Sequence, residues 1–208
     1  MNKNQATLTK IGLDKYLENG VLKTLGSSKK ICIDVGLSEV APYSATWLLN
    51  DPERCVIGIE PLEYNWECLE GKHDDGKEDP TDGWPGIRLG EREGKPDEIR
   101  GRILPRGRKG WGPTVAPYLI ENRFFGLRCA IDNVEKPAEK DFYHMSDPGS
   151  SSLLKPTKKH PGSIKKTERV QCVSLKHILS YIDWHQFGVV EHLKVDCEGG
   201  DLEVIKSA

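Results

Sequence analysis

Acidic residues follow three short apolar segments of this sequence. Asp34 lies at the end of the first segment, and Glu60 ends the second. The third segment is followed by Asp196 and Glu198. In an open α/β sheet the carboxyl ends of parallel strands meet at one edge, and ligands bind in the crevice there. We therefore expect these acids to line one site.

The residue types suggest what the site could do. Glu60 can accept hydrogen bonds from two ribose hydroxyls through the two oxygens of its carboxylate. Gly36 allows a ligand to approach the backbone near a helix N-terminus, although a single glycine does not make a dinucleotide fingerprint. Asp196 and Glu198 could bind a metal ion, act as a general base or orient a substrate hydroxyl. Each position also has a structural interpretation, as an exposed strand-end acid or a tight turn.

Alternating strands and helices are expected to position these residues. The spacing of apolar residues predicts helices over residues 12–25, 45–49, 62–69, 175–182 and 202–205. It predicts strands over residues 31–36, 55–61, 125–131, 141–145, 170–175 and 193–195, with further regular structure at 114–120. This order predicts an α/β fold with a mostly parallel sheet flanked by helices.

One long segment has neither the apolar spacing of a helix nor that of a strand. From about residue 71 to 112 the sequence is dense in Gly, Pro and charged residues and has almost no core-forming side chains. Loops of that length are usually functional or disordered. We therefore predict a single domain over residues 1–208 that carries a mobile polar insertion. The basic residues of this segment could contact phosphates, but acids dilute them and aromatic residues are scarce, so no nucleic-acid partner is expected.

The composition excludes several classes of protein. The chain has 208 residues, of which 37% are hydrophobic and 30% charged, with a net charge of −2. No apolar run is long enough for a membrane helix, and the N-terminus lacks the apolar core of a signal peptide, so we expect a cytoplasmic protein. The six cysteines and six histidines show no metal-ligand spacing, so no metal is expected.

Five short segments together resemble the FkbM family of S-adenosylmethionine-dependent methyltransferases. They are residues 33–36, 58–61, 150–153, 173–175 and 193–199. The most specific is the Lys-x-Asp-x-Glu-Gly run that begins at Lys194, and the next is the Glu-Pro pair at Glu60. The resemblance implies a Rossmann-like methyltransferase fold, with S-adenosyl-L-methionine as cofactor. It also implies O-methylation, often of a hydroxyl on a sugar, a lipid-linked glycan or a small metabolite.

The resemblance also implies roles for the cofactor residues. Asp34 and Gly36 would line the methionine part of the cofactor together with Ser38, and Glu60 would hold the ribose. The residues expected to face the adenine are Ala130, Ile131 and Asp132. In the family the loop after the first strand usually has an asparagine and a second glycine, where this chain has Ser38 and then Val40 or Ala41.

The resemblance places the catalytic residues beside the transferred methyl group. Asp196 would accept or orient the proton of the acceptor hydroxyl, and Glu198 would be its partner or a substrate contact. Two alternatives remain at this point. One is a non-catalytic or truncated Rossmann-like domain. The other is a nicotinamide-dependent oxidoreductase, which the strand-acid pattern favours and the single glycine disfavours.

The last predicted strand, 193–195, is expected to lie at an exposed edge of the sheet. Family members continue into further strands, whereas this chain stops at Ala208. We therefore expect either a C-terminally incomplete domain or self-association along that edge. The expected partner is a small-molecule or glycan acceptor, whose identity the sequence leaves open.

Overall fold

The computed structural model describes residues 3–23, 28–38, 41–69, 98–99, 102–103, 123–146, 148–157 and 162–208. The helices are α1 (Lys3–Ile11), α2 (Pro42–Asn50), α3 (Glu63–Leu69), α4 (Leu175–Leu179), α5 (Trp184–Phe187) and α6 (Asp201–Lys206), with 3-10 turns η1 (Asp14–Tyr16) and η3 (Pro148–Ser150). The strands are β1 (Leu17–Glu18), β2 (Val21–Leu22), β3 (Lys30–Val35), β4 (Arg54–Ile59), β5 (Glu98–Ile99), β6 (Arg102–Ile103), β7 (Phe124–Leu127), β8 (Ala130–Ile131), β9 (Ala138–Met145), β10 (Ile164–Val173) and β11 (Val190–Val195).

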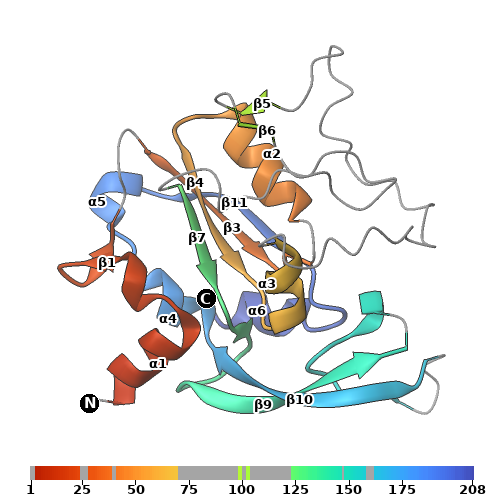
Figure 1. The fold of residues 1–208 in the computed structure, drawn as a ribbon. Coiled ribbons are helices and arrows are strands. Elements are labelled where there is room, and N and C mark those ends of the chain that lie inside the picture. Colours follow the sequence, from red (N-terminus) through yellow and green to blue (C-terminus); the bar gives the residue numbers. More distant parts are fainter. Residues whose placement is uncertain are drawn as a thin grey trace.

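The main sheet is parallel and has the strand order β11-β3-β4-β7. Successive side chains of a strand point to opposite faces, so each face of this sheet has its own core. One core joins Ile33 and Ile57 to apolar residues of α1, α4 and α6. The other joins Cys32 and Val56 to α2 and α3. Figure 1 shows α1 and α4 across the sheet from α2. The predicted α/β fold with a mostly parallel, helix-flanked sheet is confirmed.

Two glycines on neighbouring strands make room for aromatic rings. A Cβ atom on Gly58 would lie 2.5 Å from the ring of Phe124, and one on Gly126 would lie 2.5 Å from the ring of Trp66. The Trp66 Nε1 group donates to the backbone oxygen of Glu60 at 2.8 Å. The aromatic side chains therefore pack flat against the sheet and hold α3 and the end of β4 in place.

A second sheet of three strands has the order β8-β10-β9. Strands β9 and β10 form a long antiparallel ribbon, and β8 pairs in parallel with β10. In Figure 1 this ribbon lies beyond the arrowheads of the main sheet, at the carboxyl ends of its strands. Its own small core includes Ala130, Phe142, Val170 and Cys172.

The prediction of one strand over residues 125–131 is wrong. The main-sheet strand β7 ends at Leu127, and the chain then crosses to the second sheet as β8. The backbone N–H of Arg128 donates to Ile11 at the end of α1, and that of Asp132 donates to Val173 of β10. The sequence hides this crossing because both short strands and the buried Cys129 between them are apolar.

The predicted helix over residues 12–25 is also wrong. Helix α1 ends at Ile11, and the strands β1 and β2 form a hairpin about Asn19 and Gly20. These two residues have φ angles of 52° and 84°, as a type I′ turn requires, and Asn-Gly is the strongest short hairpin signal in a sequence. The apolar spacing in this segment serves the hairpin and η1 instead of a helix.

Most other predicted elements are confirmed, with shifted ends: α2, α3, α4, α6, β3, β4, β9, β10 and β11. The predicted insertion lies largely outside the described residues, apart from the short antiparallel pair of β5 and β6. The segment 114–120 also lies outside them. Among the helices that the structure describes, none is long and apolar enough to cross a membrane.

Strand β11 forms one edge of the main sheet, as expected, in the part of the chain that is described. Apolar side chains near this edge are exposed: Val189, Leu193, Leu202 and Ile205. Edges of this kind tend to pair with another strand. Self-association along β11 stays a prediction, which light scattering can test.

Candidate active site

The strands of the main sheet end level with one another. The last residues of β11, β3 and β4 are paired in register, and the residues that follow them are Asp196, Gly36 and Glu60. Asp34 lies one residue before the end of β3. The structure thus brings these four residues to the same end of the sheet, while their roles stay predictions.

Gly36 is required by the packing of two loops. Its φ angle is +82°, which favours glycine. A Cβ atom at this position would overlap the carbonyl oxygen of Asp196. The backbone N–H of Asp196 donates to Val35 at 3.1 Å, and that of Gly36 donates to Ile59 at 2.9 Å. The close approach that demands a glycine is therefore made by the loop after β11.

Asp34 is a buried carboxylate with two kinds of partner. One oxygen, Oδ2, accepts hydrogen bonds from the backbone N–H and the hydroxyl of Ser44, at 3.1 and 2.6 Å. The other, Oδ1, lies 3.3 Å from the Nζ atom of Lys194. Burial raises the pKa of Asp34, and the positive charge of Lys194 and the hydrogen bonds from Ser44 oppose that rise.

Lys194 is a residue of this site to which the sequence interpretation gave no role. Its ammonium group donates to the carbonyl oxygen of Gly36 and lies 3.7 Å from the carboxylate of Asp196. Lys194 and Asp34 are also direct partners in the pairing of β11 with β3. The signal that could have found this residue is its place in the Lys-x-Asp-x-Glu-Gly run.

Glu60 is buried as well, and backbone groups hold its carboxylate. The N–H of Ser38 donates to Oε2 at 3.2 Å, and the N–H of Leu62 donates to Oε1 at 2.9 Å. Burial raises the pKa of Glu60 to about 7, despite these hydrogen bonds. The contact with Ser38 ties the loop after β3 to the end of β4.

Asp196 and Glu198 lie in the loop between β11 and α6. The Asp196 side chain is 61% exposed, so its carboxylate can reach a molecule outside the core. Between them, Cys197 donates its backbone N–H to Asp201 at 2.9 Å. Burial raises the pKa of the Cys197 thiol to about 12, so this thiol stays protonated and inert near neutral pH.

Uncommon backbone conformations gather in these two loops. Ser38 and Ala41 follow β3 with φ angles of +58° and +43°, and Glu198 follows β11 with +44°. A left-handed conformation costs most non-glycine residues about 1–2 kcal/mol. In these loops serine, alanine and glutamate therefore adopt a conformation that favours glycine. Strain of this kind is concentrated at functional sites.

The segment Ser150–Leu154 reaches the same loop from the second sheet. The Ser152 hydroxyl lies 3.5 Å from the carbonyl oxygen of Cys197, and a Cβ atom on Gly199 would lie 3.3 Å from the Leu154 side chain. The serine-rich segment 150–154 therefore contacts the loop that carries Asp196 and Glu198.

The three residues expected at the adenine are separated in the structure. Ala130 belongs to a small core against which Leu62 packs, and Leu62 follows closely after Glu60 in the chain. Ile131 is buried in the core under α4, and the carboxylate of Asp132 pairs with Lys140 of β9. Only Ala130 is thereby linked to the surroundings of Glu60 by a described contact.

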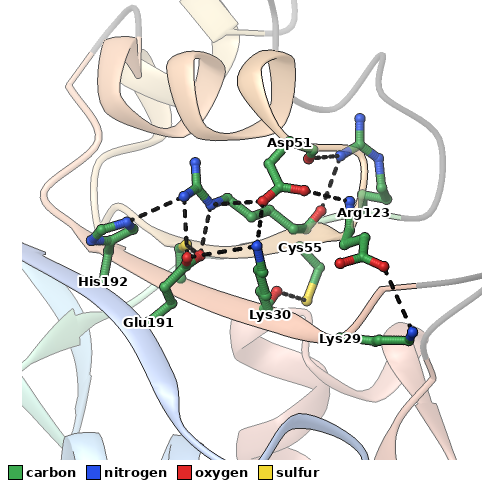
Figure 2. A network of polar contacts seen from close by, with 10 residues as sticks. Lys29, Lys30, Asp51, Cys55, Arg123, Glu191 and His192 are labelled. Atoms are coloured by element: carbon green, nitrogen blue, oxygen red, sulfur yellow. Dashed lines mark hydrogen bonds and ion pairs between the residues drawn. The ribbon is translucent and has the colours of Figure 1, made fainter.

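The opposite end of the main sheet carries a denser set of charges (Figure 2). Arg54 donates to Glu191 at 2.7 and 3.2 Å, and Lys30 donates to Asp51 at 2.8 Å. Arg123 donates to the backbone oxygens of Leu48, Asp51 and Arg54. These contacts join the starts of β3, β4 and β11 to the end of α2 and the residue before β7.

No group of three or more potential metal ligands occurs within the ranges that the structure describes. Comparison with curated proteins found no match, and comparison with solved structures found none either. A family model described as "Methyltransferase FkbM domain" matches residues 38–208, which include Glu60, Asp196 and Glu198. Because this match spans most of the chain, the protein belongs to the FkbM family of S-adenosylmethionine-dependent methyltransferases.

Proposed function

We propose that this methyltransferase transfers the methyl group to a hydroxyl oxygen of a sugar, a glycolipid or a small metabolite. The observation that carries the proposal is the position of Asp196. Its carboxylate is exposed, yet its backbone packs against Gly36 in the loop after β3. A hydroxyl bound at Asp196 would therefore lie next to a ligand bound along that loop.

The residues present fit the cofactor of the family. Each oxygen of the Glu60 carboxylate accepts one backbone N–H and keeps acceptor capacity for a ribose hydroxyl. Asp34, Glu60 and Asp196 supply three carboxylates near one lysine, which suits a ligand that carries positive charge. Asp34, Gly36 and Ser38 would hold the methionine part, and Glu60 the ribose.

We also propose an adenine side to this site, with Ala130 as its best supported residue because the small core that contains Ala130 packs against Leu62. Ile131 and Asp132 would have to contribute through their backbone, since their side chains are engaged elsewhere.

S-adenosylmethionine supplies a methyl group on a positively charged sulfur. Transfer of this methyl group to the acceptor oxygen would form a carbon–oxygen bond and break the carbon–sulfur bond, whose electron pair would stay on sulfur. Asp196 accepts the hydroxyl proton and passes it to water. Glu198 orients the acceptor from the same loop. Alignment of the oxygen, carbon and sulfur supplies much of the rate.

Incubation with methyl-labelled S-adenosylmethionine and a panel of acceptors tests this function. We expect label in an ether of a hydroxylated acceptor, and none when the same hydroxyl is blocked beforehand. Asp196→Asn should abolish labelling while it retains binding of S-adenosylhomocysteine. Label in an amine or a thiol of the acceptor would contradict the proposed oxygen acceptor.

A further inference from the structure

Lys194 is a mostly buried lysine, with 15% of its side chain exposed. Lys194 donates to the carbonyl oxygen of Val35 at 3.5 Å and has three further oxygen partners nearby. These are the carbonyl of Gly36, the Asp34 carboxylate at 3.3 Å and the Asp196 carboxylate at 3.7 Å. The ammonium group of Lys194 therefore lies among oxygen atoms of the protein itself.

The partners of Lys194 belong to different parts of the site. Gly36 lies in the loop on the cofactor side, whereas Asp196 lies in the loop on the acceptor side. The ring of Tyr43, on α2, lies 5.6 Å from the Lys194 nitrogen. Charged Lys194 also lowers the pKa values of Glu60 and Cys197. The ammonium group of Lys194 thus contacts residues of β3, β11 and α2, and its charge acts on the carboxylate of Glu60 after β4.

Within the described ranges, Asp34 and Asp196 have no other ion-pair partner. Asp34 is 1% exposed, so its carboxylate is shielded from solvent in the folded protein. Removing one partner of a buried pair leaves an uncompensated charge, which is strongly destabilising.

We propose that Lys194 is a positioning residue: its ammonium group provides the counter-charge of buried Asp34 and ties the loop after β3 to Asp196. The second part of this inference rests on the proposed function, because it assumes that the two loops hold the cofactor and the acceptor. The first part does not depend on the reaction.

The counter-charge role is tested by thermal unfolding of the cofactor-free protein at about pH 5 and about pH 8. The variants are Lys194→Met, the double variant Lys194→Met with Asp34→Asn, and Lys30→Met. Lys30 is a matched control because it is a lysine of the adjacent strand that pairs with Asp51 at the other end of the sheet.

Burial raises the pKa of Asp34, and Lys194 opposes the rise. Without Lys194, ionising Asp34 costs more stability as the pH increases. We expect Lys194→Met to lose several more degrees of melting temperature between the two pH values than the parent. The titratable neighbours Glu60, Asp196, Cys197 and Tyr43 are present in both Lys194 variants, so the extra loss should disappear in the double variant if Asp34 causes it.

Equal pH dependence in Lys194→Met and Lys30→Met would overturn the counter-charge role. So would an extra loss that persists in the double variant. If Lys194→Met does not fold, recovery of folding in the double variant supports the role, and failure of both contradicts it.

The second readout is the affinity for S-adenosylhomocysteine, measured by calorimetry. We expect Lys194→Met to bind about tenfold more weakly, which is the scale of one lost charge-assisted contact. Lys194→Arg should recover part of the loss, and Lys30→Met should bind like the parent. Undiminished affinity in Lys194→Met would contradict the loop-tying role. Absence of binding in the parent itself would instead contradict the proposed function, and the unfolding experiment would still decide the counter-charge role.

Discussion

The two ends of the main sheet use charge in different ways. At the amino ends of the strands, Lys30 and Arg54 meet Asp51 and Glu191 in a network with short contacts (Figure 2). At the carboxyl ends, Asp34 and Glu60 are buried, and in the described part of the chain a single cation, Lys194, lies beside the acids there.

Backbone angles also distinguish the carboxyl ends of the strands. Residues with positive φ follow β3 and β11 at the carboxyl ends, namely Gly36, Ser38, Ala41, Glu198 and Gly199. Satisfied charges stabilise a fold, whereas buried acids and uncommon backbone angles cost stability and persist at functional sites. The comparison therefore separates a stabilising end of the sheet from the end that we propose binds the cofactor and the acceptor.

The largest expected effect comes from Gly36→Ala. The new methyl group would overlap the Asp196 carbonyl oxygen, at a φ angle of +82°. We expect a loss of about 4 kcal/mol in the free energy of unfolding, measured in urea. Gly20→Ala, in the hairpin turn of β1 and β2, is the matched control, because its φ is +84° but no atom lies within 4 Å of the added carbon. It should cost only about 1 kcal/mol, and equal losses would show that the two loops do not approach as described.

A second prediction uses two carboxylates whose pKa values shift in opposite directions, Glu60 at the carboxyl end of the sheet and Asp51 at the amino end. Burial raises the pKa of Glu60 from 4.5 to about 7. Between pH 4.5 and about 7 the folded protein therefore holds a proton on Glu60 that the unfolded chain has released. The free energy of unfolding should fall as the pH rises through this range, by up to about 3 kcal/mol. Glu60→Gln should remove this fall in urea unfolding experiments.

Asp51 provides the contrast for that experiment. The hydrogen bond from Lys30 lowers the pKa of Asp51, so its contribution to stability is present above its unfolded pKa and is lost as the pH falls. Asp51→Asn should therefore flatten the acid side of the stability profile and leave the window near pH 7 unchanged. The same response in both variants would remove the distinction between the two ends.

Arg54→Met should cost about 2 kcal/mol of stability, because it leaves the partly buried Glu191 without its bidentate partner. Its affinity for S-adenosylhomocysteine should equal that of the parent, because the network lies at the other end of the sheet. Calorimetry and urea unfolding on one preparation check both statements. Weakened binding would mean that the amino end also shapes the site.

The smallest effect is expected for Ser38→Gly. Ser38 is exposed and has a φ of +58°, so glycine should relieve strain and raise the free energy of unfolding by about 1 kcal/mol. Ser38→Ala keeps the strain and serves as control. A gain in the alanine variant would show that the hydroxyl, not the backbone angle, carries the cost.

The sequence predicted the positions of the strand-end acids because a buried parallel strand followed by an acid is a local pattern. It did not reveal the role of Lys194, which depends on its pairing with Asp34 across two strands that lie far apart in the chain. The same limit explains the error at β7 and β8. Apolar residues on both sides of Cys129 do not show that they belong to different sheets.

The hairpin of β1 and β2 shows a different kind of error. Its Asn-Gly turn was present in the sequence, but the apolar spacing around it was given more weight. The left-handed angles of Ser38 and Ala41 could not be predicted, because neither residue type favours them. Such angles are set by packing of the whole loop.

Calorimetric titration with S-adenosylhomocysteine tests most directly whether the carboxyl end of the sheet binds the cofactor. The parent protein should bind, and its affinity should rise about tenfold between about pH 6 and about pH 8 as Glu60 ionises, since its pKa is about 7. Glu60→Gln should bind more weakly at pH 8 and lose this pH dependence, while Arg54→Met should keep it. Equal affinity and equal pH dependence in the parent and Glu60→Gln, or no binding by the parent, would contradict the account.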